Sequence, residues 1–245
     1  MIDLVKVTNL KKSYGSKEAV KGISFEIKQN EILGLLGPNG SGKTTTIGMM
    51  LGLLKPSNGE ILIDGINIEK NRIEILKKIN FISPYIELPK KLTVKQNLIV
   101  YGKLYSVLDI KKRIEYLSEK LRLGDLLNKI TGELSSGQKN RVSLAKALIN
   151  KPKVLLLDEP TASLDPEIGD FVRTFLEDYK KEMKISILLA SHNMNEVTRL
   201  CKSTLMMKDG IIIDSGSPEE LIRKHGRQNL EEVFLKLTRG KNEFN

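Results

Sequence analysis

Residues 37–44 read Gly-Pro-Asn-Gly-Ser-Gly-Lys-Thr and match the pattern G-x-x-x-x-G-K-[ST] of a phosphate-binding loop. Its glycines allow successive backbone N–H groups to face one anion, and Lys43 adds a positive charge for β- and γ-phosphates. A glycine-rich turn beside a solvated lysine is the alternative. The apolar run Glu31-Ile-Leu-Gly-Leu-Leu36 before the loop and the helical run after it favour the phosphate loop, which requires this strand-loop-helix setting.

The loop and the first turn of the following helix supply the predicted nucleotide-binding residues. Thr44 offers a hydroxyl to Mg²⁺, and the helix directs the positive end of its dipole at the phosphates. The predicted contacts are Gly37, Pro38, Asn39, Gly40, Ser41, Gly42, Lys43, Thr44 and Thr45.

Hydrophobic periodicity predicts the α/β class. Buried strands are expected at 31–36, 154–157 and 185–190, an edge-like antiparallel pair at 4–10 and 20–27, and hairpins about Asp64-Gly65 and Asp209-Gly210. Helices are expected at 44–54, throughout 71–150, after Asp165-Pro166 and in a tail at 218–224 and 230–237. A capping box of Thr93 with Gln96 starts one helix of the middle block.

Composition sets outer limits on the class of protein. The 245 residues suffice for one large α/β domain, and no apolar run approaches the length of a membrane span. The start Met-Ile-Asp-Leu-Val-Lys-Val lacks a basic region followed by an apolar one, so no signal peptide is expected. The single cysteine, Cys201, suits a reducing cytosol. A net charge of +10 permits binding to nucleic acid or to an anionic membrane surface. The lysines are scattered beside acidic residues and aromatic residues are few, so solvated helix faces fit equally well.

Two carboxylates follow the apolar run Val154-Leu-Leu-Leu157. This is the Walker B arrangement, in which Asp158 holds Mg²⁺ through water and Glu159 orients and deprotonates the water that attacks the γ-phosphate. The alternative is a strand that merely ends in a polar turn. The phosphate loop elsewhere in the chain favours a catalytic role for the two carboxylates.

The run Leu134-Ser135-Ser136-Gly137-Gln138 closely matches the Leu-Ser-Gly-Gly-Gln signature, with Ser136 in place of the first glycine. With these motifs the chain resembles, over essentially its whole length, the ATP-binding subunits of ABC transporters, and its length, signature variant and tail resemble exporter-type (ABC-2-like) members. The resemblance implies that the signature binds the γ-phosphate of a second subunit's ATP. Ser135 and Gln138 also fit a capping box of the helix at 138–149, and both roles can hold at once.

Three further residues acquire roles from the same resemblance. Tyr14 matches the aromatic that stacks on the base, Asp165 the loop between the two sites, and His192 the histidine that senses the γ-phosphate. In isolation, Tyr14 and His192 would be read as packing residues and Asp165 as a helix N-cap.

One position departs from the family pattern. Aligning residues 79–94 with the family places Pro84 where a glutamine normally reaches Mg²⁺ and the attacking water. Pro84 offers no side-chain donor or acceptor, which predicts altered coupling to the membrane partner and lower turnover. Tyr85 and Glu87 are candidates to substitute.

The resemblance implies an ABC ATPase fold, in which a P-loop core of mostly parallel sheet carries an antiparallel β subdomain and an inserted helical subdomain. We expect residues 1–245 to form one ATP-binding domain, with the helical subdomain at about 85–150 and a helical tail at about 217–245. The implied ligands are ATP and Mg²⁺. The implied partners are an integral membrane permease and a second, identical ATP-binding subunit, at the cytoplasmic face of the membrane and without nucleic acid.

Two other functions stay open. One is a soluble ABC-type ATPase that acts on nucleic acid, ribosomes or cofactor assembly. The other is a nucleotide-switched scaffold subunit that barely hydrolyses ATP, suggested by Pro84. The sequence leaves undetermined the cargo, the direction of transport and whether the second ATP-binding subunit is an identical chain.

Overall fold

The computed structural model of the chain describes residues 3–84 and 86–239. It divides into two compact units, the first made of Met1–Ile75 and Ser186–Asn245 and the second of Leu76–Ile185. The predicted substitute residue Tyr85 and the last part of the predicted tail, 240–245, lie outside the described residues.

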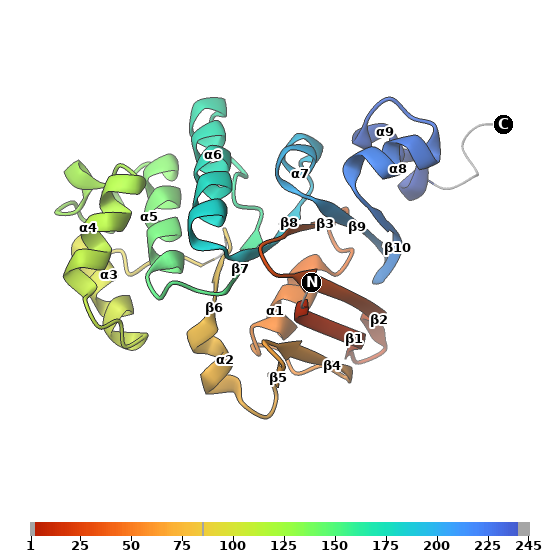
Figure 1. Cartoon of the computed structure of the whole chain (residues 1–245), viewed down its shortest axis with the longest axis horizontal. Coiled ribbons are helices and arrows are strands. Elements are labelled where there is room, and N and C mark those ends of the chain that lie inside the picture. Colours follow the sequence, from red (N-terminus) through yellow and green to blue (C-terminus); the bar gives the residue numbers. More distant parts are fainter. Residues whose placement is uncertain (1–2, 85, 240–245) are drawn as a thin grey trace. The chain divides into compact units, whose positions relative to one another are not determined.

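An antiparallel sheet of four strands, in the order β2-β1-β4-β5, belongs to the first unit (Figure 1). Its strands are β1 (Asp3–Tyr14), β2 (Lys17–Lys28), β4 (Asn58–Ile63) and β5 (Ile66–Asn67). The first pair was expected to be antiparallel and is, but both strands are longer than predicted. Tyr14 pairs with Lys17 across a turn in which Gly15 has φ 58°, so Tyr14-Gly15 closes the hairpin instead of ending the strand early.

Parallel pairing dominates around β3 (Ile32–Leu36) in the same unit. Strands β8 (Ser186–Ser191) and β9 (Ser203–Lys208) flank β3 and run parallel to it, and β10 (Ile211–Gly216) returns antiparallel beside β9. Every residue of β3 and β8 is buried. This agrees with the apolar runs predicted at 31–36 and 185–190, because strands covered on both faces lose the polar alternation.

Helix α1 (Lys43–Met50) follows the phosphate loop but ends four residues before the predicted end. Gly52 has φ 63°, and the N–H groups of Leu53 and Leu54 both donate to the carbonyl of Gly48. Leu54 then folds back onto the helix, where a Cβ on Gly48 would lie only 2.8 Å from Leu54 Cδ1. The glycines therefore terminate the helix before Lys55-Pro56 can.

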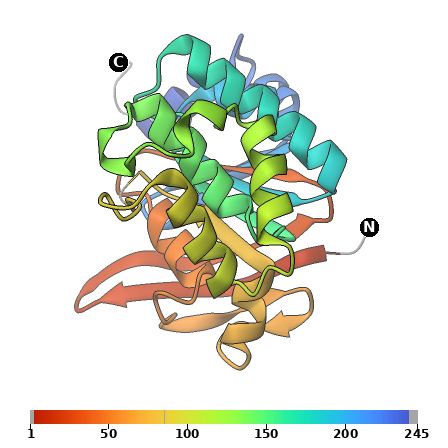
Figure 2. The same ribbon diagram turned by 90° about the vertical axis from the view of Figure 1, so that its left-hand side faces the viewer.

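The second unit combines a parallel strand pair with helices (Figure 2). Strand β6 (Ile79–Ile82) pairs with β7 (Val154–Asp158), although the prediction was helical throughout 71–150. Only four residues form β6, too few for a period-2 pattern to show against its helical neighbours. The helices are α2 (Arg72–Lys78), which spans the boundary of the units, α3 (Val94–Leu104), α4 (Ile110–Lys120), α5 (Ser136–Leu148) and α6 (Pro166–Met183).

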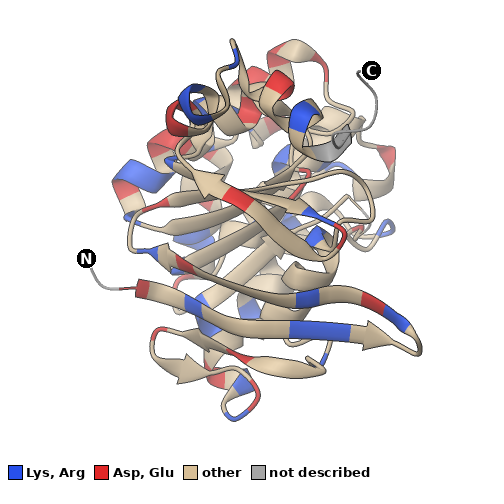
Figure 3. Ribbon diagram, turned by 90° about the vertical axis from the view of Figure 1, so that its right-hand side faces the viewer, with Lys and Arg blue, Asp and Glu red and all other residues tan. Residues whose placement is uncertain are grey.

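The remaining predicted elements are confirmed. Asp64-Gly65 and Asp209-Gly210 form the two hairpin turns, with positive φ at all four residues. The tail holds α8 (Pro218–His225) and α9 (Leu230–Arg239), after α7 (Met194–Leu200). On the face in Figure 3, Lys and Arg are interspersed with Asp and Glu along several elements. Within 3–84 and 86–239, no helix has the length and apolar character that crossing a bilayer requires.

Candidate functional site

The phosphate loop leaves the buried end of β3 and leads directly into α1. Gly40 and Gly42 have φ 81° and 108°, which lie in the left-handed region that glycine tolerates best. The Lys43 ammonium, on a side chain only 6% exposed, donates to the carbonyls of Gly37 and Pro38 at 2.7 and 3.2 Å. The loop backbone therefore surrounds the Lys43 ammonium, and these two hydrogen bonds hold the turn in place.

Neighbouring backbone packs closely against the loop glycines. A Cβ on Gly37 would lie 2.4 Å from the carbonyl of Met207, and one on Gly42 would lie 2.7 Å from the carbonyl of Ala19. The N–H of Gly210 donates to the carbonyl of Ser41 at 3.1 Å, which ties the β9–β10 turn to the loop. Because backbone atoms cannot give way as a flexible side chain can, these two positions require glycine.

Ser41 gives the loop an unused polar group. Its hydroxyl is buried and has no hydrogen-bond partner among the residues that the structure describes. A buried hydroxyl without a partner is costly, and each such group in a native protein calls for an explanation. A phosphate oxygen would accept this hydrogen bond, so the loop fits a nucleotide phosphate. Thr44 and Thr45 stand in the first turn of α1, where the helix dipole favours an anion.

His192 follows the last residue of β8, and the phosphate loop follows the last residue of β3. The two strands are parallel and in register, with Leu36 opposite Ser191. Gly37 and His192 therefore leave neighbouring strands at the same edge of the sheet. This is the edge at which α/β proteins bind ligands, and it brings the predicted histidine close to the predicted phosphate site.

Tyr14 ends β1 and is 48% exposed, with the ammonium of Lys12 5.1 Å from its ring centroid. The exposed ring of Tyr14 can stack on a base. The stacking role itself stays a prediction.

In the second unit, Asp158 and Glu159 stand at the carboxyl end of β7. All of β7 is buried, and Asp158 is only 2% exposed. Glu159 has φ 52°, a left-handed conformation that is unfavourable for a residue with a Cβ and that clusters at functional sites. The carboxylate of Asp158 and the hydroxyl of Thr44 are oxygen donors, which is the donor type that Mg²⁺ prefers.

The signature segment forms the start of α5. Ser135 accepts from the N–H of Gln138 at 3.3 Å, and Gln138 Oε1 accepts from the N–H of Ser135 at 3.1 Å, so the predicted capping box is present. Leu134 is buried, Ser136 is exposed, and Gly137 lies where a Cβ would meet Ile168 of α6 at 3.3 Å. The capping alternative is confirmed, and it leaves the anion-binding role open.

Asp165 caps α6, where its carboxylate accepts from the N–H of Ile168 at 2.9 Å. The N-cap alternative named for this residue is therefore confirmed. Its predicted role between two ATP sites is not tested by this hydrogen bond.

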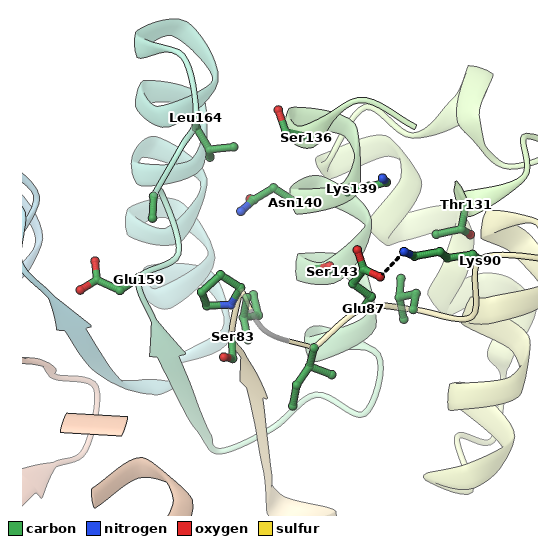
Figure 4. Close-up of a pocket in the computed structure, with 15 residues that line it drawn as sticks. Ser83, Glu87, Lys90, Thr131, Ser136, Lys139, Asn140, Ser143, Glu159 and Leu164 are labelled. Carbon is green, nitrogen blue, oxygen red and sulfur yellow. Dashed lines mark ion pairs between the residues drawn. The ribbon is translucent and has the colours of Figure 1, made fainter. Parts of the chain in front are cut away.

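A cavity of about 210 Å³ lies within the second unit (Figure 4). Pro84, Ser136, Asn140 and Glu159 are among its lining residues. Glu159 projects from the end of β7 to the side away from Glu87 (Figure 4). Pro84, the residue that departs from the family pattern, and Glu159 therefore line the same cavity.

Glu87, a candidate to substitute for glutamine at position 84, forms an ion pair of 2.6 Å with Lys90. The hydrogen bond from Lys90 lowers the pKa of Glu87 below its usual value. Glu87 is thus engaged with a lysine of its own segment.

The sequence reasoning missed Ser191, directly before His192, and Glu196, four positions after it, which are 0 and 1% exposed. The Ser191 hydroxyl donates to Glu196 Oε2 at 2.7 Å. The signal that could have revealed them is the spacing Asn193-x-x-Glu196 directly after a buried strand, which is typical of a helix N-terminus.

Comparison with known proteins agrees with these features. Residues 20–162 match the family model described as ABC transporter. The chain is 38% identical over 227 residues to the ABC transporter ATP-binding protein NatA of Bacillus subtilis (strain 168), a match that covers 91% of this chain and 92% of NatA. It is 37% identical over 232 residues to the Nod factor export ATP-binding protein I of Rhizobium sp. (strain N33), covering 94% and 76% of the two chains.

Among solved structures, the chain is similar to the dimeric, post-hydrolysis state of the ATP-binding cassette MJ0796 bound to ADP and Pi. The TM-score is 0.79 with 28% identity, covering 87% of this chain and 98% of the other. The predicted α/β fold of the ABC ATPase type is confirmed. One chain contains the phosphate-loop, Walker B and signature motifs, and its relatives along nearly its full length are ATP-binding proteins of transporters. The chain therefore belongs to the ABC transporter family as an ATP-binding subunit.

Proposed function

We propose that this subunit hydrolyses ATP and, as a dimer closed around two ATP molecules, drives export through a separate membrane permease. The observation that carries the proposal is the phosphate loop, in which Lys43 is folded onto the loop carbonyls and the buried Ser41 hydroxyl lacks a partner among the described residues. Buried donors arranged around one loop suit the phosphates of a nucleotide. His192 leaves the neighbouring strand on the same edge, which suits contact with the γ-phosphate.

The chain's own residues divide the chemistry of hydrolysis. The loop 37–45 orients the phosphates, and Tyr14 stacks on the base. Glu159 accepts the proton of the water that attacks the γ-phosphorus, a general-base role that suits a carboxylate. Thr44 and Asp158 would hold Mg²⁺, which neutralises phosphate charge when bound.

The dimer is proposed from the signature. Ser135 and Gly137 stand at the N-terminal end of α5, where open N–H groups and the helix dipole favour an anion, here the γ-phosphate of the partner's ATP. Asp165 lies in the loop between the two sites. ATP would stabilise the closed dimer through its higher affinity for that state, and hydrolysis would remove this stabilisation.

The remaining proposals concern the assembly. Residues 1–245 act as one ATP-binding domain, with a helical subdomain at about 85–150 that contacts the permease at the cytoplasmic face of the membrane and a tail from about 217. Similarity to the Nod factor export ATP-binding protein I of Rhizobium sp. (strain N33) supports export as the direction. Pro84 in the place of the family glutamine predicts slow turnover.

The test uses Glu159→Gln, which removes the base and keeps the side-chain size. We expect ATP binding to persist, hydrolysis to fall at least about 100-fold, and ATP to shift the variant to a dimer in size-exclusion chromatography with light scattering. Glu115→Gln, on the exposed face of α4, is the matched control and should hydrolyse at the unaltered rate. Full activity in Glu159→Gln would show that another group is the base.

The membrane partner is tested by purifying the Glu159→Gln variant from detergent-solubilised membranes with and without ATP and identifying what accompanies it. Recovery of a multi-span protein supports the transporter role. Recovery of ribosomal or nucleic-acid-processing proteins alone would favour the soluble ABC-type ATPase. A single-turnover assay that detects no hydrolysis would favour the nucleotide-switched scaffold.

A further inference from the structure

Three side chains form a closed set of hydrogen bonds around His192. The Ser191 hydroxyl donates to Glu196 Oε2 at 2.7 Å and accepts from the N–H of Asn193 at 3.0 Å. Asn193 Oδ1 in turn accepts from the N–H of Glu196 at 3.2 Å. We name Ser191, Asn193 and Glu196 the histidine clamp, because they fix the backbone on both sides of His192.

The histidine clamp is fixed at the sheet end and at the helix end. Ser191 is the last residue of β8 and pairs with Leu36. Asn193 caps α7, and Glu196 stands in the first turn of that helix. His192 itself is exposed and makes the transition between strand and helix. Its backbone therefore cannot rotate without breaking a buried hydrogen bond or a helix cap.

Glu196 is a carboxylate at a buried position, where an ionised group is energetically unfavourable. Its side chain is 1% exposed, and Val197 and Leu200 of the same helix are buried beside the sheet. A carboxylate so deeply buried costs free energy unless it is hydrogen-bonded, and an apolar residue would pack there without that cost. The buried carboxylate is consistent with a need to hold the backbone at the end of β8 in one conformation.

We infer that Glu196 is a positioning residue that acts through Ser191 to aim His192 at the nucleotide, an inference that rests on the proposed function. A misplacement of about 1 Å in a reacting site can cost as much as 100-fold in rate. Loss of the Glu196 carboxylate should therefore lower turnover more than nucleotide affinity, because the phosphate loop is held by other contacts.

The experiment compares Glu196→Leu with Glu196→Gln in the intact chain, because Gln keeps an oxygen that can accept from Ser191. We expect Glu196→Leu to lower kcat for ATP about tenfold with KM within about twofold, and Glu196→Gln to recover to within about threefold of the unaltered chain. In a His192→Ala background, Glu196→Leu should cause no further loss, because its effect passes through His192.

Glu31→Leu is the matched control. Glu31 is also buried at 7% exposure and also accepts from a serine, Ser203, but it lies before β3, at the opposite end of that strand from the phosphate loop. The Glu31→Leu substitution should lower the melting temperature and leave kcat unchanged. Should Glu196→Leu fail to fold, Ser191→Ala breaks the same clamp, and it should lower kcat with the same dependence on His192.

Three outcomes would overturn the inference. They are an unchanged kcat in both clamp variants, an equal loss with and without His192, and a Gln variant as slow as the Leu variant. An unaltered chain that fails to hydrolyse ATP would instead contradict the proposed function, so the two failures are distinguishable.

Discussion

Leu36 and Ser191 are paired in register, each as the last residue of its strand, at one edge of the first unit. One residue further on, the chain becomes the phosphate loop in one case and His192 in the other. Segments about 150 positions apart in the sequence thus reach the same place because parallel strands carry their carboxyl ends to a common edge. Mutational tests of either segment report on the same site.

Lys43→Ala should weaken binding of MgATP. The substitution removes a buried ammonium that donates to Gly37 and Pro38, so it removes both the charge offered to the phosphates and a contact that shapes the loop. We expect the Kd to rise at least about tenfold, which corresponds to about 1.4 kcal/mol, measured by isothermal titration calorimetry. Lys21→Ala, an exposed lysine of β2, is the control. Equal Kd values in the Lys43 variant and the unaltered chain would contradict the phosphate-loop assignment.

Ser135→Ala and Thr93→Ala remove the same kind of interaction from two helices. Each residue is the N-cap of a capping box, of α5 and α3 respectively. Each variant should lose about 1 kcal/mol in the free energy of unfolding, measured by urea denaturation. Only Ser135→Ala should also lower the ATPase rate, because only that serine belongs to the signature. Equal ATPase rates in the two variants would show that Ser135 acts as a cap alone.

A structural feature could be predicted from the sequence when the residues that determine it are close together along the chain. The strand-loop-helix order around residues 37–42, the Asp64-Gly65 turn and the Thr93 capping box depend on a few neighbouring residues, and all were predicted from the sequence. Strand β6 was not, because its pairing with Val154–Asp158 is the cause of its extended form and lies about 75 positions away. The end of α1 was misplaced because Gly52 ended the helix before Pro56.

At the candidate site, the sequence suggests which residues to test but says little about their environment. Asp158 and Glu159 were chosen from the apolar run before them, but the left-handed backbone of Glu159 has no sequence signal, since a glutamate seldom adopts that conformation. The buried contact of Ser191 with Glu196 was also missed, because a Glu in a helix pattern is normally assigned to the solvent face.

The strain at Glu159 can be measured with Glu159→Gly and Glu159→Ala. Both variants lose the carboxylate, but only Ala keeps a Cβ at φ 52°. A left-handed conformation costs a non-glycine residue about 1–2 kcal/mol. Part of this advantage for Gly is offset by the flexibility of the unfolded chain, so the Gly variant should unfold with a free energy about 1 kcal/mol higher than the Ala variant in urea. Equal stabilities would show that the backbone relaxes when the carboxylate is removed, and both variants should lack ATPase activity.

Lys146 predicts a pH-dependent stability. Burial lowers its pKa to about 8, and its ammonium lies 3.3 Å from the carbonyl of Phe81, which accepts a hydrogen bond from it. Between about pH 8 and the unfolded-state value of 10.5, the unfolded chain binds more protons at this site than the folded chain. The contribution of Lys146 to stability therefore rises as the pH rises through this window.

The measurement compares the unaltered chain with Lys146→Met, which carries no titrating group at the site. The difference in free energy of unfolding should move in favour of the unaltered chain by up to about 3 kcal/mol between pH 8 and 10.5, since each pKa unit is worth about 1.4 kcal/mol. A difference that stays flat with pH would show that Lys146 remains solvated in the folded chain.

Pro84→Gln should increase ATPase turnover. Pro84 has no polar side-chain atom and lines the cavity that Glu159 also lines. A glutamine amide would add a donor and an acceptor that can orient the attacking water, and we therefore expect kcat to rise. Pro84→Ala is the control for the release of the backbone from proline. If Ala raises kcat as much as Gln, the effect belongs to the backbone and the glutamine amide contributes nothing.

The cap at the start of α5 also affects how an anion would be received there. Ser135 uses an oxygen lone pair to accept from the N–H of Gln138, while the proton of its own hydroxyl is not needed for that contact. The same side chain can therefore cap its helix and donate to an arriving phosphate. Its rotamer is selected during folding, so the loss of side-chain entropy is complete before any phosphate reaches the helix.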